Sequence, residues 1–250
     1  MLEGEYLEAK KLSERIAADM EPPRFYQDNT TESEASKKIF HQNATIQECL
    51  LIMEKRRDRV GHGLSHVRKV ALDTGTLILI ERNCDKAEGN VERMVLLGHL
   101  AGLLHDIKRE EPDHAHRGAI EAGHILKTFD LSTAERRAIT QAIGNHEAFK
   151  PEHPLDETSM QLLSDALYDA DKFRWGPDNF TETVWLMVAP RKIPLKVLLD
   201  HFLPSLRGIE KISETFRTPT GRKYGPDFIS RGLKIGKLVH AELVQRYVQN

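Results

Sequence analysis

Cysteine is scarce in this sequence: only Cys49 and Cys84 occur among 250 residues, and their spacing forms no paired motif. We therefore expect a reduced, cytoplasmic protein without a disulfide framework. Long apolar runs are also missing, and the first 20 residues are rich in charge, so the sequence predicts neither a membrane span nor a signal-peptide core. A membrane is accordingly not among the expected partners.

A large net charge is absent too. The chain has 36 lysines and arginines against 38 aspartates and glutamates, which gives a formal net charge of −2. Since nucleic-acid-binding domains are usually strongly basic, a nucleic-acid partner is not expected. The charge is nevertheless uneven, because residues 191–240 contain eleven lysines and arginines but four acidic residues.

Alternating apolar and polar residues, the pattern of a half-buried strand, form no convincing run in this sequence. From Ala44 onward apolar residues instead recur with a helical period, and the first helix of this series is expected to end in the basic cluster Arg56, Arg57 and Arg59. The sequence thus predicts an all-α protein with a single helical bundle. We expect residues 1–43 to form an N-terminal helix and linker, residues 44–176 the core, and residues 177–250 a C-terminal helical extension packed on the core.

The most informative stretch that is present is residues 100–109, which contains the doublet His105-Asp106. An apolar helical stripe leads directly to His105, so the doublet is predicted at the inner end of a buried helix. Aspartate is seldom fully buried without a partner. Two explanations remain open: an ordinary helix-end aspartate bonded to an amide or arginine, or a carboxylate that binds a divalent metal ion.

Three other predicted helices place a metal-competent side chain on their apolar face. These side chains are His66, His146 and Asp171. Each has an ordinary explanation by itself; His66, for example, suits a histidine at the edge of the core. Burying several histidines and two carboxylates together costs several kcal/mol per ion unless a cation compensates. The set therefore favours a bound cation.

These motifs resemble those of the HD-domain superfamily of metal-dependent phosphohydrolases, over residues 61–176. The resemblance rests on His66-Val-Arg-Lys-Val70, on the His-Asp doublet, and on Tyr168-Asp-Ala-Asp171-Lys, which is similar to the family element D-A-D-[KR]. It implies an all-α HD-domain bundle. The usual H-D-[IL]-G-K is replaced by His105-Asp106-Ile-Lys-Arg109, and the GYP extension is absent after His146. A cyclic-di-GMP substrate is therefore not expected.

The resemblance implies a divalent metal ion in the core. Its expected ligands are His66, His105, Asp106 and Asp171. Nitrogen and oxygen ligands without thiolate suit Mn²⁺, Fe²⁺, Co²⁺, Ni²⁺, Zn²⁺ or Mg²⁺. Such an ion would supply a water of lowered pKa for attack on phosphorus. The expected catalytic residues are Asp106 and the cations Lys108, Arg109 and Lys172, which would stabilise charge on the phosphoryl oxygens.

The number of ions, one or two per chain, stays open. In dinuclear members of the superfamily, histidines from the two intervening helices hold a second ion. His116 and His146 are expected in these places, with His114 as the competitor of His116 and Asp106 able to bridge the ions. His124 is expected in the core.

The basic segment 191–240 has two interpretations. It can be the solvated face of two long helices. Alternatively, residues 218–228 form a glycine-rich loop that closes over the metal cleft. Arg222 and Lys223 would then bind a substrate phosphate, and Tyr224 would stack on a base.

The expected activity is that of a metal-dependent phosphohydrolase cleaving a phosphomonoester or phosphodiester. The expected partner is a small phosphorylated substrate, a nucleotide or a related molecule, and a homo-oligomer remains open. Two alternatives are a non-catalytic module that binds metal or nucleotide, and a di-iron oxygenase.

Overall fold

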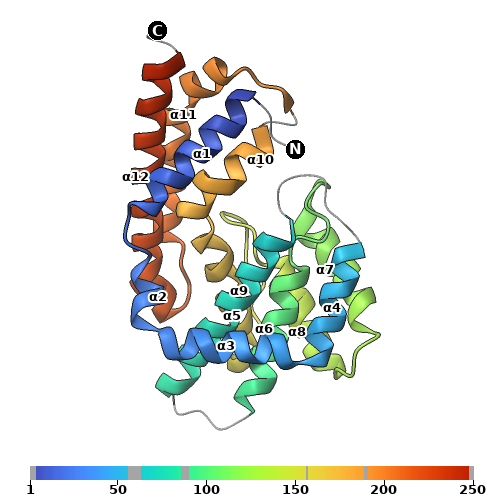
Figure 1. Cartoon of the computed structure of the whole chain (residues 1–250). Coiled ribbons are helices and arrows are strands. Elements are labelled where there is room, and N and C mark those ends of the chain that lie inside the picture. The colour runs from blue at the N-terminus through green and yellow to red at the C-terminus, as the bar shows by residue number, and fades with distance from the viewer. Residues whose placement is uncertain (1–3, 56–62, 86–89, 156, 189–190, 248–250) are drawn as a thin grey trace.

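The computed structural model describes residues 4–55, 63–85, 90–155, 157–188 and 191–247, and its regular elements there are all helical (Figure 1). The all-α prediction is confirmed. The helices are α1 (Gly4–Ala18), α2 (Arg24–Asp28), α3 (Thr30–Gln42), α4 (Ala44–Lys55), α5 (Leu64–Asp85), α6 (Val91–Leu104), α7 (His114–Leu126), α8 (Thr133–Gly144), α9 (Thr158–Phe173), the π-helix η1 (Asn179–Thr183), α10 (Val184–Val188), α11 (Leu195–Glu210), the 3₁₀-helix η3 (Lys211–Glu214) and α12 (Pro219–Tyr247). Within the described residues, no helix is both long and apolar enough to cross a membrane.

Helices α5 and α6 form the centre of the lower part of the molecule in Figure 1, where they pack antiparallel. Gly102, near the end of α6, allows the two backbones to approach closely, because a Cβ atom there would lie 2.4 Å from the Cα atom of Ala71. This crossing brings His66, near the start of α5, next to His105, which follows α6 directly.

Helices α8 and α9 complete the core with the apolar stripes that the sequence predicts. Ser132 precedes α8 and forms a capping box with Glu135. Ile139 and Ile143 of α8 are buried, and so is Leu167 of α9. His146 and Asp171 follow these buried residues at helical spacing. They are therefore directed inward as well.

The N-terminal segment differs from the expected linker. Residues 30–42 form helix α3, which packs against α5. Phe40 is buried, and the buried Ser36 donates a hydrogen bond of 2.8 Å to the carbonyl oxygen of Leu72. The buried face of α3 thus includes a polar residue. For this reason the pattern of apolar residues does not predict the helix. The arginine cluster expected at Arg56, Arg57 and Arg59 lies outside the described residues.

The C-terminal helix also starts earlier than expected. The prediction of a glycine-rich loop over residues 218–228 is wrong, since α12 begins at Pro219. The buried carboxylate of Asp169, on α9, accepts hydrogen bonds of 2.8 Å from the backbone N–H groups of Arg217 and Thr218. Gly225 serves close packing rather than flexibility, because a Cβ atom there would lie 2.1 Å from the ring of Phe216.

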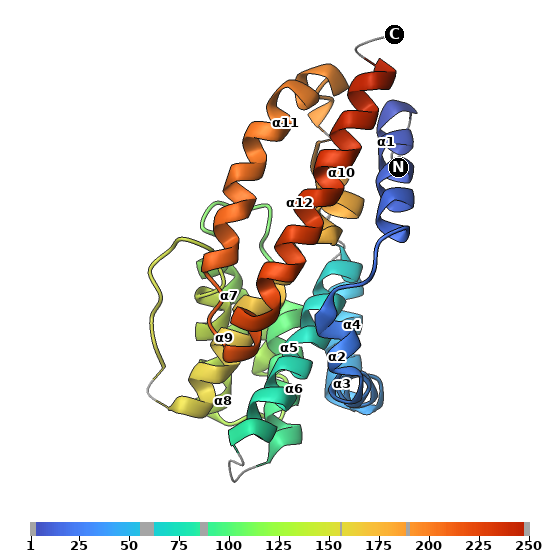
Figure 2. The same cartoon turned by 90° about the vertical axis from the view of Figure 1, so that its left-hand side faces the viewer.

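Helices α10, α11 and α12 lie together with α1 in the upper part of Figure 1, and Figure 2 shows α11 and α12 side by side along most of their length. The first helix of the chain therefore packs against the last. The division of the chain at residues 43 and 176 stays a prediction.

His99 is buried inside α6, where its Nε2 atom lies 2.9 Å from the hydroxyl oxygen of Ser36. Burial lowers the pKa of His99 to about 3, compared with about 6.5 in an unfolded chain. Between these values the unfolded chain binds more protons. The contribution of His99 to stability is therefore complete above about pH 6.5 and is lost as the pH falls toward 3.

We expect acid to destabilise the protein through this residue. Between pH 7 and pH 4.5, the contribution of His99 to the free energy of unfolding falls by about 2.5 kcal/mol. Urea unfolding at both pH values, of the wild type and of His99→Gln, measures this effect, because the glutamine amide does not titrate. The loss on acidification should be smaller in the variant by that amount. An equal loss in both proteins would contradict the assignment.

Candidate metal centre

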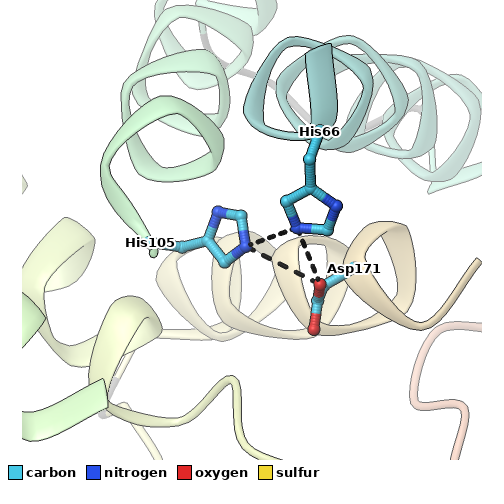
Figure 3. A group of neighbouring side chains, drawn as sticks. All are labelled: His66, His105 and Asp171. Atoms are coloured by element: carbon cyan, nitrogen blue, oxygen red, sulfur yellow. Dashed lines mark hydrogen bonds and ion pairs between the residues drawn. The ribbon is translucent and has the colours of Figure 1, made fainter. Parts of the chain in front are cut away.

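Three helices bring His66, His105 and Asp171 together at the end of the α5–α6 crossing (Figure 3). The Nε2 atom of His66 lies 3.3 Å from Nε2 of His105 and 3.5 Å from Oδ1 of Asp171. Nε2 of His105 lies 3.6 Å from the same carboxylate oxygen. Ligand atoms about 2.1 Å from a tetrahedral ion are about 3.4 Å apart. The three donor atoms therefore have the spacing of ligands that share one ion.

Asp106 joins this group through one oxygen and reaches a further histidine through the other. Its Oδ2 atom lies 3.7 Å from Nε2 of His66 and 3.6 Å from Nε2 of His105. Its Oδ1 atom lies 3.4 Å from Nε2 of His146. Both doublet residues are buried, His105 fully and Asp106 with 6% of its surface exposed. A carboxylate in this position is able to bridge two cations.

Backbone carbonyl groups determine which ring nitrogen of two histidines faces the carboxylates. Nδ1 of His105 lies 2.8 Å from the carbonyl oxygen of Gly102, and Nδ1 of His146 lies 2.6 Å from that of Ile143. A carbonyl oxygen only accepts hydrogen bonds, so each Nδ1 is the donor. In the neutral rings Nε2 then presents a lone pair to the carboxylates. Metal-bound histidines commonly have this arrangement.

The two carboxylates are ionised at neutral pH in spite of their burial. Burial would raise the pKa of Asp106, but His105, His146 and His66 hold this pKa well below its ordinary value. For Asp171, Lys172 and the histidines outweigh burial in the same way and lower the pKa well below its ordinary value. The centre thus contains two negative charges, which protonated imidazoles or a divalent ion can balance.

Two of the three predicted cationic residues lie at the centre. The buried Nζ atom of Lys172 donates hydrogen bonds to Oδ2 of Asp171 at 2.5 Å and to the carbonyl oxygen of His146 at 2.8 Å. Arg109 is half-buried, with its Nη1 atom 3.8 Å from Oδ1 of Asp106. Lys108 does not reach the centre, since it pairs with Glu111 at 2.9 Å. It also does not line the cavity beside the centre, and its catalytic role stays a prediction.

The histidine that α7 directs to the centre is His114, so the prediction of His116 is wrong. Nε2 of His114 lies 3.8 Å from Oδ1 of Asp106, and its ring centre lies 5.1 Å from that of His146. His116 is exposed, because two residues along a helix point to nearly opposite sides. His124 is exposed as well, so its predicted core position is also wrong.

The helical spacing of the buried residues in α7 indicates that His114 is the inward-facing histidine. The buried positions Gly118, Ala122 and Ile125 lie on one helical face. Extending this face by four residues toward the N-terminus gives His114.

The three substrate-binding residues predicted in the C-terminal segment do not face the centre. Tyr224 is 5% exposed and packs against Phe25 with their ring centres 5.8 Å apart, and its hydroxyl donates to Asp28 at 3.1 Å. Arg222 and Lys223 are exposed on α12 and do not line the cavity beside the centre. The expected closure of this segment over the cleft is therefore wrong, and the solvated-face interpretation applies to Arg222 and Lys223 but not to the buried Tyr224.

A cavity of about 200 Å³ lies beside the centre. Its lining combines ligand candidates and cations with several apolar side chains. The lining residues are His66, Asp106, Arg109, Asp171, Lys172, Arg174, Trp175, Asn179, Thr183, Val184, Met187, Val188 and Arg191. The apolar part of this lining was not predicted from the sequence. Trp175 lies in the turn that follows α9, beyond the helical pattern that places Asp171.

No protein-family model matches the sequence, and no curated protein matches it. Among solved structures, the crystal structure of a predicted HD superfamily hydrolase from an uncultured Thermotogales bacterium is similar to this chain, with a TM-score of 0.49 and 21% sequence identity. The similarity covers 82% of this chain and 97% of that protein.

Proposed function

We propose that this protein is a metal-dependent phosphohydrolase that cleaves a phosphomonoester or phosphodiester bond of a small organic molecule. One observation carries the proposal. Imidazole nitrogens of buried histidines and two ionised carboxylates converge beside a cavity that basic side chains also line. This combination suits a divalent cation on one side and an anionic substrate on the other.

The residues that would hold the metal ion are His66, His105, Asp106 and Asp171. When bound there, the ion would supply an acidified water and polarise a phosphoryl oxygen. Lys172 orients Asp171 with one N–H group and binds the carbonyl oxygen of His146 with another. An ammonium group has three donors, so the third can bind a phosphoryl oxygen of the substrate.

The apolar part of the cavity lining suits a substrate with a flat or apolar organic part. Trp175, Val184 and Met187 would contact this part, and Asn179 and Thr183 also line the cavity. Asn179 and Thr183 are the first and last residues of the π-helix η1, an irregular helix that is frequent at functional sites. A nucleotide has the required combination of phosphate and flat base.

The proposal is tested with a panel of phosphoesters and Mn²⁺, Co²⁺ or Ni²⁺. The panel contains nucleoside monophosphates, glycerol phosphates and an aryl phosphodiester, and released phosphate or alcohol is measured. We expect hydrolysis that EDTA abolishes and added metal restores, with nucleotides preferred over glycerol phosphates by at least about tenfold, or 1.4 kcal/mol. Hydrolysis that is indifferent to EDTA would contradict the proposal. Metal binding without hydrolysis of any ester would favour a binding module.

A further inference from the structure

We propose that the guanidinium group of Arg109 takes the place of a second metal ion, so that the centre binds one divalent ion per chain. This inference rests on the proposed function, because it assumes an ion at His66, His105 and Asp171. It concerns the other side of Asp106, where a second ion would bind.

The donor atoms for a second ion are present in the structure. Oδ1 of Asp106 faces away from the first position and lies 3.4 Å from Nε2 of His146 and 3.8 Å from Nε2 of His114. The rings of these two histidines lie 5.1 Å apart, centre to centre. A carboxylate oxygen and two imidazole nitrogens would be an adequate ligand set for a first-row ion.

Arg109 already forms a hydrogen bond with one of these candidate ligand atoms. Its Nη1 atom lies 2.9 Å from Nε2 of His114 and 3.8 Å from Oδ1 of Asp106. A guanidinium group only donates hydrogen bonds, so Nε2 of His114 is the acceptor and its lone pair is occupied. Nδ1 of His114 then carries the proton and lies 2.9 Å from Oε1 of Glu147. Both ring nitrogens of His114 therefore have partners without a metal ion.

The spacing of the donor atoms agrees with this assignment. Within the described residues, the groups of three candidate donors lying within 4.8 Å of one another are His66–His105–Asp171 and His105–Asp106–His146. Neither group includes His114. A second ion would have to displace the hydrogen bond of Arg109 and remain next to a permanent positive charge, which Coulomb repulsion opposes.

The first position is different, because its cationic neighbour does not contact the ligand oxygen. Lys172 binds Oδ2 of Asp171, whereas Oδ1 of the same carboxylate faces His66 and His105. The lysine therefore orients this carboxylate without covering the donor atoms. Arg109 also lines the cavity beside the centre. Its guanidinium can thus bind a substrate phosphoryl oxygen in the place where a second ion would do so.

Titration of the metal-free protein with Mn²⁺, followed by equilibrium dialysis and electron paramagnetic resonance, tests this inference. The wild type should bind one ion per chain and give the spectrum of an isolated Mn²⁺ ion. Arg109→Ala should bind two ions with a spin-coupled spectrum, and Arg109→Ala/His114→Ala should return to one. Arg191→Ala is the matched control, since Arg191 is another arginine that lines the same cavity, and it should bind one ion.

Two coupled ions in the wild type would overturn the inference and leave the proposed function standing. The same conclusion would follow if folded Arg109→Ala still bound one ion. A wild type without any bound ion would overturn both proposals. The number of ions bound by the wild type can overturn the inference by itself, so the test does not depend on a variant that folds. Arg109→Gln is a second variant, with a side chain closer in size to arginine.

Discussion

Replacement of Asp171 by asparagine is expected to lower kcat/KM for a phosphorylated substrate at least a thousandfold, or about 4 kcal/mol. Oδ1 of Asp171 faces His66 and His105, and Oδ2 accepts the hydrogen bond of Lys172. An amide has the same size but no negative charge, so it is a poor metal ligand. Its NH₂ group would also face either the ammonium group or the ion.

Metal content by mass spectrometry and kcat/KM on the same preparations measure this effect. Asp165→Asn is the matched control, because Asp165 lies on the same helix, α9, and accepts a hydrogen bond of 2.8 Å from Gln161 away from the centre. The control should retain both its metal and its activity. Full metal occupancy and normal turnover in Asp171→Asn would contradict the assignment of Asp171 as a ligand.

Replacement of Asp73 by alanine is expected to destabilise the fold by about 3–5 kcal/mol, the usual cost of removing one partner from a buried ion pair. Asp73 and Arg174 are each 5% exposed, and Nη2 of Arg174 donates a hydrogen bond to Oδ2 of Asp73. The Tyr26 hydroxyl donates to the same oxygen at 2.8 Å. Removal of Asp73 would leave the buried guanidinium with Asp178 as its remaining carboxylate partner.

A double-mutant cycle separates this effect from a simple loss of packing. Urea unfolding of Asp73→Ala, Arg174→Met and the double variant gives the three changes in the free energy of unfolding. Because the double variant contains no unpaired charge at this position, it should lose less stability than the sum of the two single variants. A loss below about 1 kcal/mol in Asp73→Ala would show that water compensates the arginine.

The ligand candidates could be predicted from the sequence wherever a polar residue occupies the next position on the apolar face of a helix. His105 and Asp171 extend the buried faces of α6 and α9, and the structure brings them together with His66. In α7 the structure places His114 at the centre, whereas His116 was the expected residue. The period alone favours His114.

The start of α12 has a local signal, because the hydroxyl of Thr218 accepts a hydrogen bond of 2.8 Å from the backbone N–H group of Gly221 and proline occupies the first helical position. A second contact has no local signal: the carboxylate of Asp169 binds the backbone N–H group of Thr218, which lies 49 residues later. A contact between residues so far apart in the chain cannot be predicted from a local sequence pattern. The same reason applies to α3, where the buried Ser36 bonds to Leu72 and His99 of other helices.

If the centre binds a metal ion as proposed, the close approach at Gly102 has a consequence for the choice of ion. Helices α5 and α6 meet backbone to backbone there, without a layer of side chains that could yield. The helix positions that carry His66 and His105 are therefore stiffly spaced. A stiff pair of ligands discriminates ions by radius, since Mg²⁺ and Zn²⁺ bind their ligands at about 2.0–2.2 Å and Ca²⁺ needs about 2.3–2.6 Å. Gly102, which has no ligand atom in its side chain, would thus contribute to the exclusion of larger ions.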